Sequence, residues 1–100
     1  MATTTKALAR AAAATSSATL YTVPASTTAV ITNIAVTNTS ASAQTFNLLL
    51  DDVAIHTLTA LAANTTAYID LKQVLATTKT IKGFASATTV NFHISGVEIA

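Results

Sequence analysis

The sequence has no cysteine, no tryptophan, one proline and two glycines. A chain without cysteine forms no disulfide framework and carries no thiol chemistry. With glycine only at positions 83 and 96, no glycine-rich loop is available to cradle a phosphate. No serine lies in the glycine-flanked turn that presents a hydrolase nucleophile. These absences remove the usual sequence signatures of nucleotide-binding proteins and of serine hydrolases.

Charge is also scarce. Charged residues are 9% of the chain and the formal net charge is +1, whereas an ordinary soluble domain has about 25% charged residues. No basic patch is present that would bind the phosphates of a nucleic acid. A solitary domain normally uses surface charge to stay apart from its neighbours. A surface of Thr, Ser, Asn and Ala instead favours permanent packing against other subunits, where buried charge would be costly.

Residues 1–19 are of low complexity. Lys6 and Arg10 provide the positive start of a signal peptide, but the Ala, Thr and Ser that follow supply no apolar core. No stretch approaches the ~20 apolar residues of a membrane-spanning helix. We therefore expect neither secretion nor a membrane. Because Ala, Leu, Lys and Arg favour helix while a single short helix is marginal in water, we expect a flexible or weakly helical arm over residues 1–17.

Residues 29–38 show the clearest β-strand pattern and are expected to form the central strand. Side chains alternate between the two faces of a strand, so Val30, Ile34 and Val36 are expected on one apolar face. Ile31 and Ala35 then fall on the opposite, mixed face. We expect the rest of the chain to cover the apolar face.

The same alternation, with short polar turns between the runs, predicts further strands. Their ranges are 20–25, 44–50, 53–58, 65–72, 80–86 and 89–99. The residues expected to face the core are Phe46, Leu48, Leu50, Ala67, Ile69, Leu71, Val90, Phe92 and Ile94. Asp51 and Asp52 are expected to form a hairpin turn. Val74 and Leu75 are expected in a loop or single helical turn, over residues 73–78, that closes one end of the core. Glycines 83 and 96 are expected to mark β-bulges.

Seven or eight short strands with almost no helix define an all-β fold. We predict an antiparallel two-sheet β-sandwich, of jelly-roll or Greek-key type, over residues 18–100. The arm of residues 1–17 precedes it. A chain of 100 residues has the size of one domain.

Few residues are able to carry chemistry. The carboxylates are Asp51, Asp52, Asp70 and Glu98, and the histidines are His56 and His93. Adjacent strand residues point to opposite faces, and a metal site needs several converging ligands, so the Asp-Asp turn near His56 does not make one. His93 is expected on an outward row. We therefore predict a non-enzymatic protein with no catalytic residues, no metal and no cofactor.

Several segments resemble small virion proteins of tailed bacteriophages. Residues 18–25 contain a Leu-Tyr-Thr-Val-Pro-Ala start, which feeds a long strand from residue 28 that ends in the Asn-Thr-Ser of residues 38–40. Residues 61–66, 80–82 and 90–99 are similar too, so the resemblance spans residues 18–99. Ser26 stands where those proteins usually have glycine. The resemblance implies a non-enzymatic β-sandwich of the phage particle, such as a capsid cement or decoration protein, a head fibre or a tail component.

From these observations we expect a capsid cement or decoration protein, made in the host cytoplasm, that binds the outer capsid surface as an oligomer. Its partners would be copies of itself, with a trimer favoured, and the major capsid protein. Lys6, Leu8 and Arg10 are expected to dock the arm on a neighbour. The alternative is a tail or fibre component that adheres to the host surface and contacts sugars through exposed aromatic rings. The candidate rings are Tyr21, Tyr68 and Phe84, although packing in the core or in an interface is favoured for them.

Overall fold

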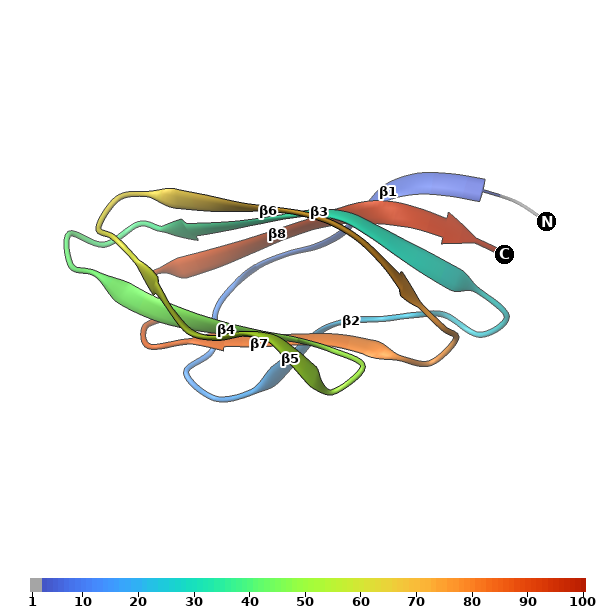
Figure 1. The fold of residues 1–100 in the computed structure, drawn as a ribbon, viewed down its shortest axis with the longest axis horizontal. Coiled ribbons are helices and arrows are strands. Elements are labelled where there is room, and N and C mark those ends of the chain that lie inside the picture. Colours follow the sequence, from blue (N-terminus) through green and yellow to red (C-terminus); the bar gives the residue numbers. More distant parts are fainter. Residues whose placement is uncertain (1–2) are drawn as a thin grey trace.

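The computed structural model describes residues 3–100, which form eight antiparallel strands in two stacked sheets and contain no helix (Figure 1). The strands are β1 (Thr3–Ala12), β2 (Ala18–Thr22), β3 (Thr28–Asn38), β4 (Gln44–Leu50), β5 (Val53–Leu61), β6 (Thr66–Leu75), β7 (Thr80–Ala85) and β8 (Val90–Ile99). One sheet has the order β1-β8-β3-β6 and the other has the order β2-β7-β4-β5. The predicted all-β, two-sheet antiparallel sandwich is confirmed.

The strand order follows from one long hairpin that has been rolled up. β4 pairs with β5, β3 with β6, β2 with β7 and β1 with β8, and every pair is antiparallel. The hairpin turns at Asp51 and Asp52, whose φ angles of 53° and 61° fit the type I′ turn that two-residue hairpins prefer. Successive pairs fall in alternate sheets, which is the jelly-roll arrangement. In this roll β8 inserts between β1 and β3.

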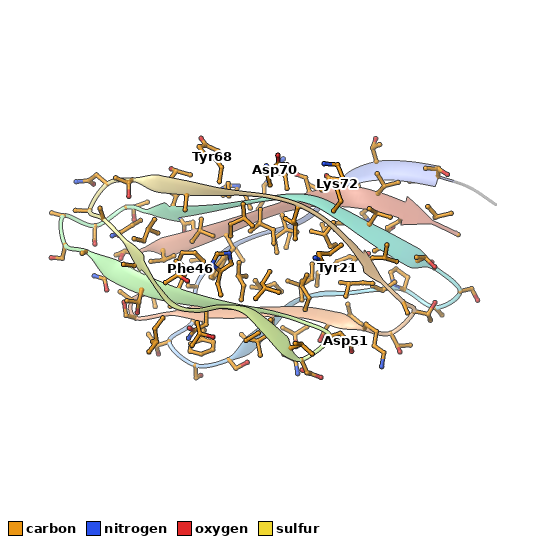
Figure 2. The ribbon with its side chains drawn as sticks, in the orientation of Figure 1. Tyr21, Phe46, Asp51, Tyr68, Asp70 and Lys72 are labelled. Atoms are coloured by element: carbon orange, nitrogen blue, oxygen red, sulfur yellow. The ribbon has the colours of Figure 1, made fainter. Side chains whose placement is uncertain are left out.

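The core lies between the two sheets. The rings of Phe46 on β4 and Phe92 on β8 meet edge to face, with centroids 6.4 Å apart, and Figure 2 shows Phe46 between the layers. The alternation expected for residues 44–50 and 90–94 is confirmed, because Leu48, Leu50 and Ile94 are buried with these rings. Each large apolar side chain buried in this way contributes about 1.5–3 kcal/mol to stability.

In β3 the predicted face pattern is wrong in the first half of the strand. Ile31 is fully buried and Val30 is only half-buried, because the register shifts between Ile31 and Asn33 against both neighbouring strands. One step in β8, from Ser95 to Gly96, lies opposite two steps in β3 and three in β6. The sheet therefore bends at this point. After Ile31, the next side chain of β3 that is buried in the core is that of Ile34.

The two glycines contact irregular strands and are not bulges themselves. At Gly96 the extra residue lies in β3, and the backbone there is so close that a Cβ on Gly96 would be 2.3 Å from the carbonyl oxygen of Val30. At Gly83 the register of β7 against β4 is regular, and the shift lies in β2 between Thr19 and Tyr21. The prediction of bulges at positions 83 and 96 is therefore wrong in its location.

The prediction of a flexible or weakly helical arm is wrong for residues 3–12, which form β1. Their backbone pairs with β8 from Asn91 to Ile99. Helix propensity is a weak local preference, and here a ladder with the last strand of the chain overrides it. Ala13, which follows β1, is buried and donates its N–H to the carbonyl of Val90 at 2.7 Å. Residues 1 and 2 of the predicted arm lie outside the described residues.

The strand β6 is longer than expected. Residues 73–75, predicted as a loop, extend its pairing with β3. Leu75 is buried as expected, but Val74 points away from the core and is 67% exposed. The expectation that Val74 closes one end of the core is therefore wrong, because the alternation of β6 continues through this position.

Candidate interaction surface

The titratable side chains do not converge on a reactive centre in the described part of the chain. No group of three or more His, Asp or Glu side chains in residues 3–100 is placed to hold a metal ion. The same residues enclose no pocket, and they form no helix long and apolar enough to cross a membrane.

Asp51 and Asp52 are occupied in ion pairs beside the hairpin turn. Lys79 Nζ lies 3.6 Å from Asp51 Oδ1, and Lys82 Nζ lies 2.6 Å from Asp52 Oδ1. His56 instead turns towards Thr59, with 3.1 Å between Nδ1 and Oγ1. Its ring centroid is 5.3 Å from that of Phe46. These contacts give the two aspartates and the histidine separate structural roles.

Glu98, near the end of β8, connects three strands. Tyr21 on β2 donates its hydroxyl hydrogen bond to one carboxylate oxygen, and Lys6 Nζ on β1 lies 3.3 Å from the other. The hydrogen bond from Tyr21, together with Lys6, holds the pKa of Glu98 below its usual range. Burial, followed by the hydrogen bond to Glu98, raises the pKa of Tyr21 well above its ordinary value. This cluster ties the two sheets together, because β2 belongs to one sheet and β1 and β8 belong to the other.

The three residues expected to dock the arm are on β1, but two of them contact their own chain. Lys6 pairs with Glu98, and Leu8 is half-buried against the core, where its Cδ1 would be 2.9 Å from a Cβ on Gly96. Arg10 is exposed and has no ion-pair partner within residues 3–100. Of the three, Arg10 is therefore the side chain most available to another molecule.

The exposed large apolar side chains are confined to two strands. All five large hydrophobic residues that are exposed in residues 3–100 lie on β5 and β6, each of which is an edge strand of its sheet. They are Val53, Ile55, Leu58, Tyr68 and Val74. We call this set the β5–β6 side. Exposed apolar side chains on edge strands are suited to contact with another molecule.

Sequence reasoning anticipated only part of the β5–β6 side. Tyr68 was a candidate for exposure and is 75% exposed, whereas Tyr21 is buried and Phe84 is half-buried. Leu58 is 69% exposed in the left-handed region at φ 46°, an unusual conformation for leucine. The side chain of Asn47 accepts the hydrogen bond of the Leu58 N–H. Leu58 lies where the register of β5 against β4 shifts, which makes a β-bulge. No sequence signal marks this bulge, because it arises from the pairing of the two strands.

No protein-family model matches the chain, and no curated protein is significantly similar to it in sequence.

Proposed function

We propose that this chain is a non-enzymatic structural protein of a bacteriophage particle, specifically a cement or decoration protein of the capsid. The observation that carries the proposal is the β5–β6 side, which leaves five large apolar residues exposed on two edge strands of a domain with only 9% charged residues. Such a surface is suited to lasting contacts with other subunits. The resemblance of residues 18–99 to small phage virion proteins is the reason for proposing a bacteriophage particle as the assembly.

The mechanism would be passive reinforcement of the shell. The protein would bind the outer capsid surface as an oligomer of its own copies, with a trimer favoured, and contact the major capsid protein. A partner that binds only the assembled shell stabilises it by mass action. Many copies that each add a small free energy would then resist the pressure of packaged DNA.

The proposal is tested on particles produced with and without this chain. We expect many copies on the head, counted by electron microscopy, and earlier release of DNA on heating when the chain is absent. The chain's absence from purified particles would reject the proposal. Confinement of the chain to the tail would favour the alternative of an adhesion component, to which the exposed ring of Tyr68 offers a stacking surface for sugars.

A point variant tests the predicted docking role of β1. Deletion of residues 1–17 would remove β1 and expose the edge of β8, so a substitution is the cleaner probe. Arg10→Asp is expected to lower the occupancy of the chain on particles. Lys79→Asp, a charge reversal at an exposed lysine on the opposite sheet's turn, serves as the matched control. Equal occupancy of the two variants would rule out a docking role for Arg10.

A further inference from the structure

The outer edge of β6 is open. β6 ends its sheet, so the outer row of backbone N–H and C=O groups has no strand partner within residues 3–100. An open edge is a site where another chain can add a strand. The edge of β5 is less suitable, because it has two register shifts and the left-handed Leu58, whereas β6 has one register shift, between Asp70 and Gln73, and no residue with a positive φ.

The side chains of β6 alternate between half-buried and exposed from Thr66 to Lys72, and Gln73, which pairs with the buried Ile31, is exposed. The inward row packs against the core and consists of Ala67, Ile69, Leu71 and Leu75. The outward row is exposed and consists of Tyr68, Asp70, Lys72 and Val74. Figure 2 shows Tyr68, Asp70 and Lys72 pointing away from the sandwich. β6 therefore presents an aromatic residue, an acid, a base and a β-branched residue in one line.

The two charged residues in this row, Asp70 and Lys72, are not paired with other charged side chains in residues 3–100. The other three carboxylates form ion pairs with the other three lysines: Asp51 with Lys79, Asp52 with Lys82, and Glu98 with Lys6. Asp70 and Lys72 are exposed and form no ion pair within residues 3–100. The chain has few charged residues, and two of them, an acid and a base without ion pairs, lie on one open edge. This arrangement indicates a partner that presents a base opposite the acid and an acid opposite the base.

The outward row is complementary to itself. In an antiparallel pair the residues directly opposite each other share a face. If two β6 strands lie antiparallel about Leu71, Asp70 of each copy faces Lys72 of the other, and Tyr68 faces Val74. Opposite charges and aromatic–β-branched pairs are both favourable cross-strand pairs.

Other registers lose this match. An axis at Asp70 or at Lys72 places like charges opposite each other, which is destabilising. An axis at Ile69 or Gln73 places both charged residues opposite uncharged ones. The pattern of side chains therefore selects one register.

We infer that a second copy of this chain binds along β6, antiparallel and related by a two-fold axis at Leu71. The contact joins the two sheets of order β1-β8-β3-β6 into one continuous sheet and covers Tyr68 and Val74. The inference deepens the proposed self-association and names its contact surface. A two-fold contact is isologous, so it builds a dimer, and in an assembly that also has three-fold contacts it would connect trimers in pairs.

The test is the oligomeric state of the purified full chain, measured by light scattering and sedimentation. The parent chain is expected to be a dimer, or a larger even-numbered assembly. Asp70→Lys and Lys72→Asp are each expected to weaken association by at least about tenfold, because the symmetry repeats every repulsive pair twice. Lys79→Asp, a charge reversal at an exposed lysine outside β6, is the matched control and is expected to leave association unchanged.

Mixing supplies the decisive arm of the experiment. A 1:1 mixture of the Asp70→Lys and Lys72→Asp chains is expected to recover association, because one chain then presents two cations to two anions of the other. The double variant D70K/K72D is expected to associate like the parent, since it restores both pairs in reverse. Circular dichroism verifies that each variant is folded.

A monomeric parent, a parent trimer, or association that both single reversals leave unchanged would overturn the inference. Failure of the mixture to recover association would overturn it as well. None of these outcomes bears on capsid binding, which is measured separately as occupancy on particles. A parent chain that forms the β6 dimer but does not bind purified particles would instead count against the proposed function.

Discussion

Replacement of Gly96 by alanine places a methyl group against the irregular part of β3. A Cβ at this position would lie 2.3 Å from the carbonyl oxygen of Val30 and 2.9 Å from Cδ1 of Leu8, whereas real Cβ contacts essentially never fall below 3.0 Å. The leucine tip can move aside, but the Val30 carbonyl belongs to a strand that is held by β6 on one side and β8 on the other. The substitution therefore forces a shift of backbone in the centre of a sheet.

The cost follows from the size of this overlap. Overpacking a well-filled core costs about 1–3 kcal/mol, and replacing glycine returns about 0.4–1 kcal/mol by restricting the unfolded chain. Because the obstacle is backbone, we take the upper part of the overpacking range and expect a net loss of about 2 kcal/mol. For a domain of this size, 1 kcal/mol corresponds to roughly 4–8 °C in Tm. The expected fall in Tm is therefore about 8–16 °C.

Thermal unfolding of the full chain, followed by circular dichroism, measures this loss. All variants are compared at one protein concentration, because self-association makes Tm depend on concentration. Ser95→Ala, at the exposed neighbouring position, is expected to stay within about 0.5 kcal/mol of the parent. Gly83→Ala is expected to fall between the two, because its Cβ would meet only side-chain atoms, the nearest being Leu20 Cδ1 at 2.9 Å. A Gly96→Ala chain as stable as the parent would refute the close approach of β8 to β3.

Three further predictions concern single side chains. Ser26→Gly is expected to raise stability by about 0.5–1 kcal/mol, measured as Tm, because Ser26 lies in the left-handed region at φ 58°. Asn38→Ala is expected to cost about 2–3 kcal/mol in urea unfolding, because its buried amide Nδ2 donates to the carbonyls of Ser42, Leu61 and Ala62 at 2.8–3.2 Å. Tyr21→Phe removes the donor that lowers the pKa of Glu98. The parent keeps the resulting stabilisation above the unfolded pKa of about 4.3 and loses it as the pH falls through the lower folded pKa, so the variant is expected to show a shallower acid loss of stability.

Matched variants separate these effects from general damage. Ser16→Gly, at an exposed position outside the left-handed region, should not stabilise the chain, and equal gains at positions 16 and 26 would remove the backbone explanation. Asn33→Ala, at a half-buried position, serves as the control for Asn38. Equal losses of unfolding free energy in the two variants would mean that the hydrogen bonds of Asn38 do not stabilise the fold. For Tyr21→Phe, identical pH profiles of parent and variant below pH 5 would exclude the hydrogen bond as the cause of the shifted Glu98 pKa.

The parts of the fold that sequence reasoning predicted well are the strands whose alternation is regular. Phe46, Leu48 and Leu50, like Val90, Phe92 and Ile94, sit where a period of two places them. The faces of Val30 and Ile31 were wrong because the register shift in β3 depends on its neighbours and not on its own residues. The extended structure of residues 3–12 was missed for a related reason. It depends on pairing with β8, almost the whole chain away, while the local composition favours helix.

The candidate surface was harder to predict than the fold. Nothing in the residues alone separates an exposed Val53 or Leu58 from a buried one, because edge and centre strands have similar composition. The self-complementary row of β6 was visible as an alternation through residue 72, but its extension to Val74 required the pairing with Val30. The unused charges at Asp70 and Lys72 became evident only when the other ion pairs were known.

The insertion of β8 between β1 and β3 has a consequence for how the protein is made. The ribosome delivers β8, in the middle of this sheet, after the other seven strands, so β1 has no neighbour in its sheet until residues 90–99 emerge. The nascent polypeptide cannot complete its fold segment by segment. It must wait until β8 is available and then close contacts between β1 and β8 that are far apart in the sequence, which is a slow type of folding. Removal of β8 is therefore expected to be far more damaging than removal of the edge strand β1.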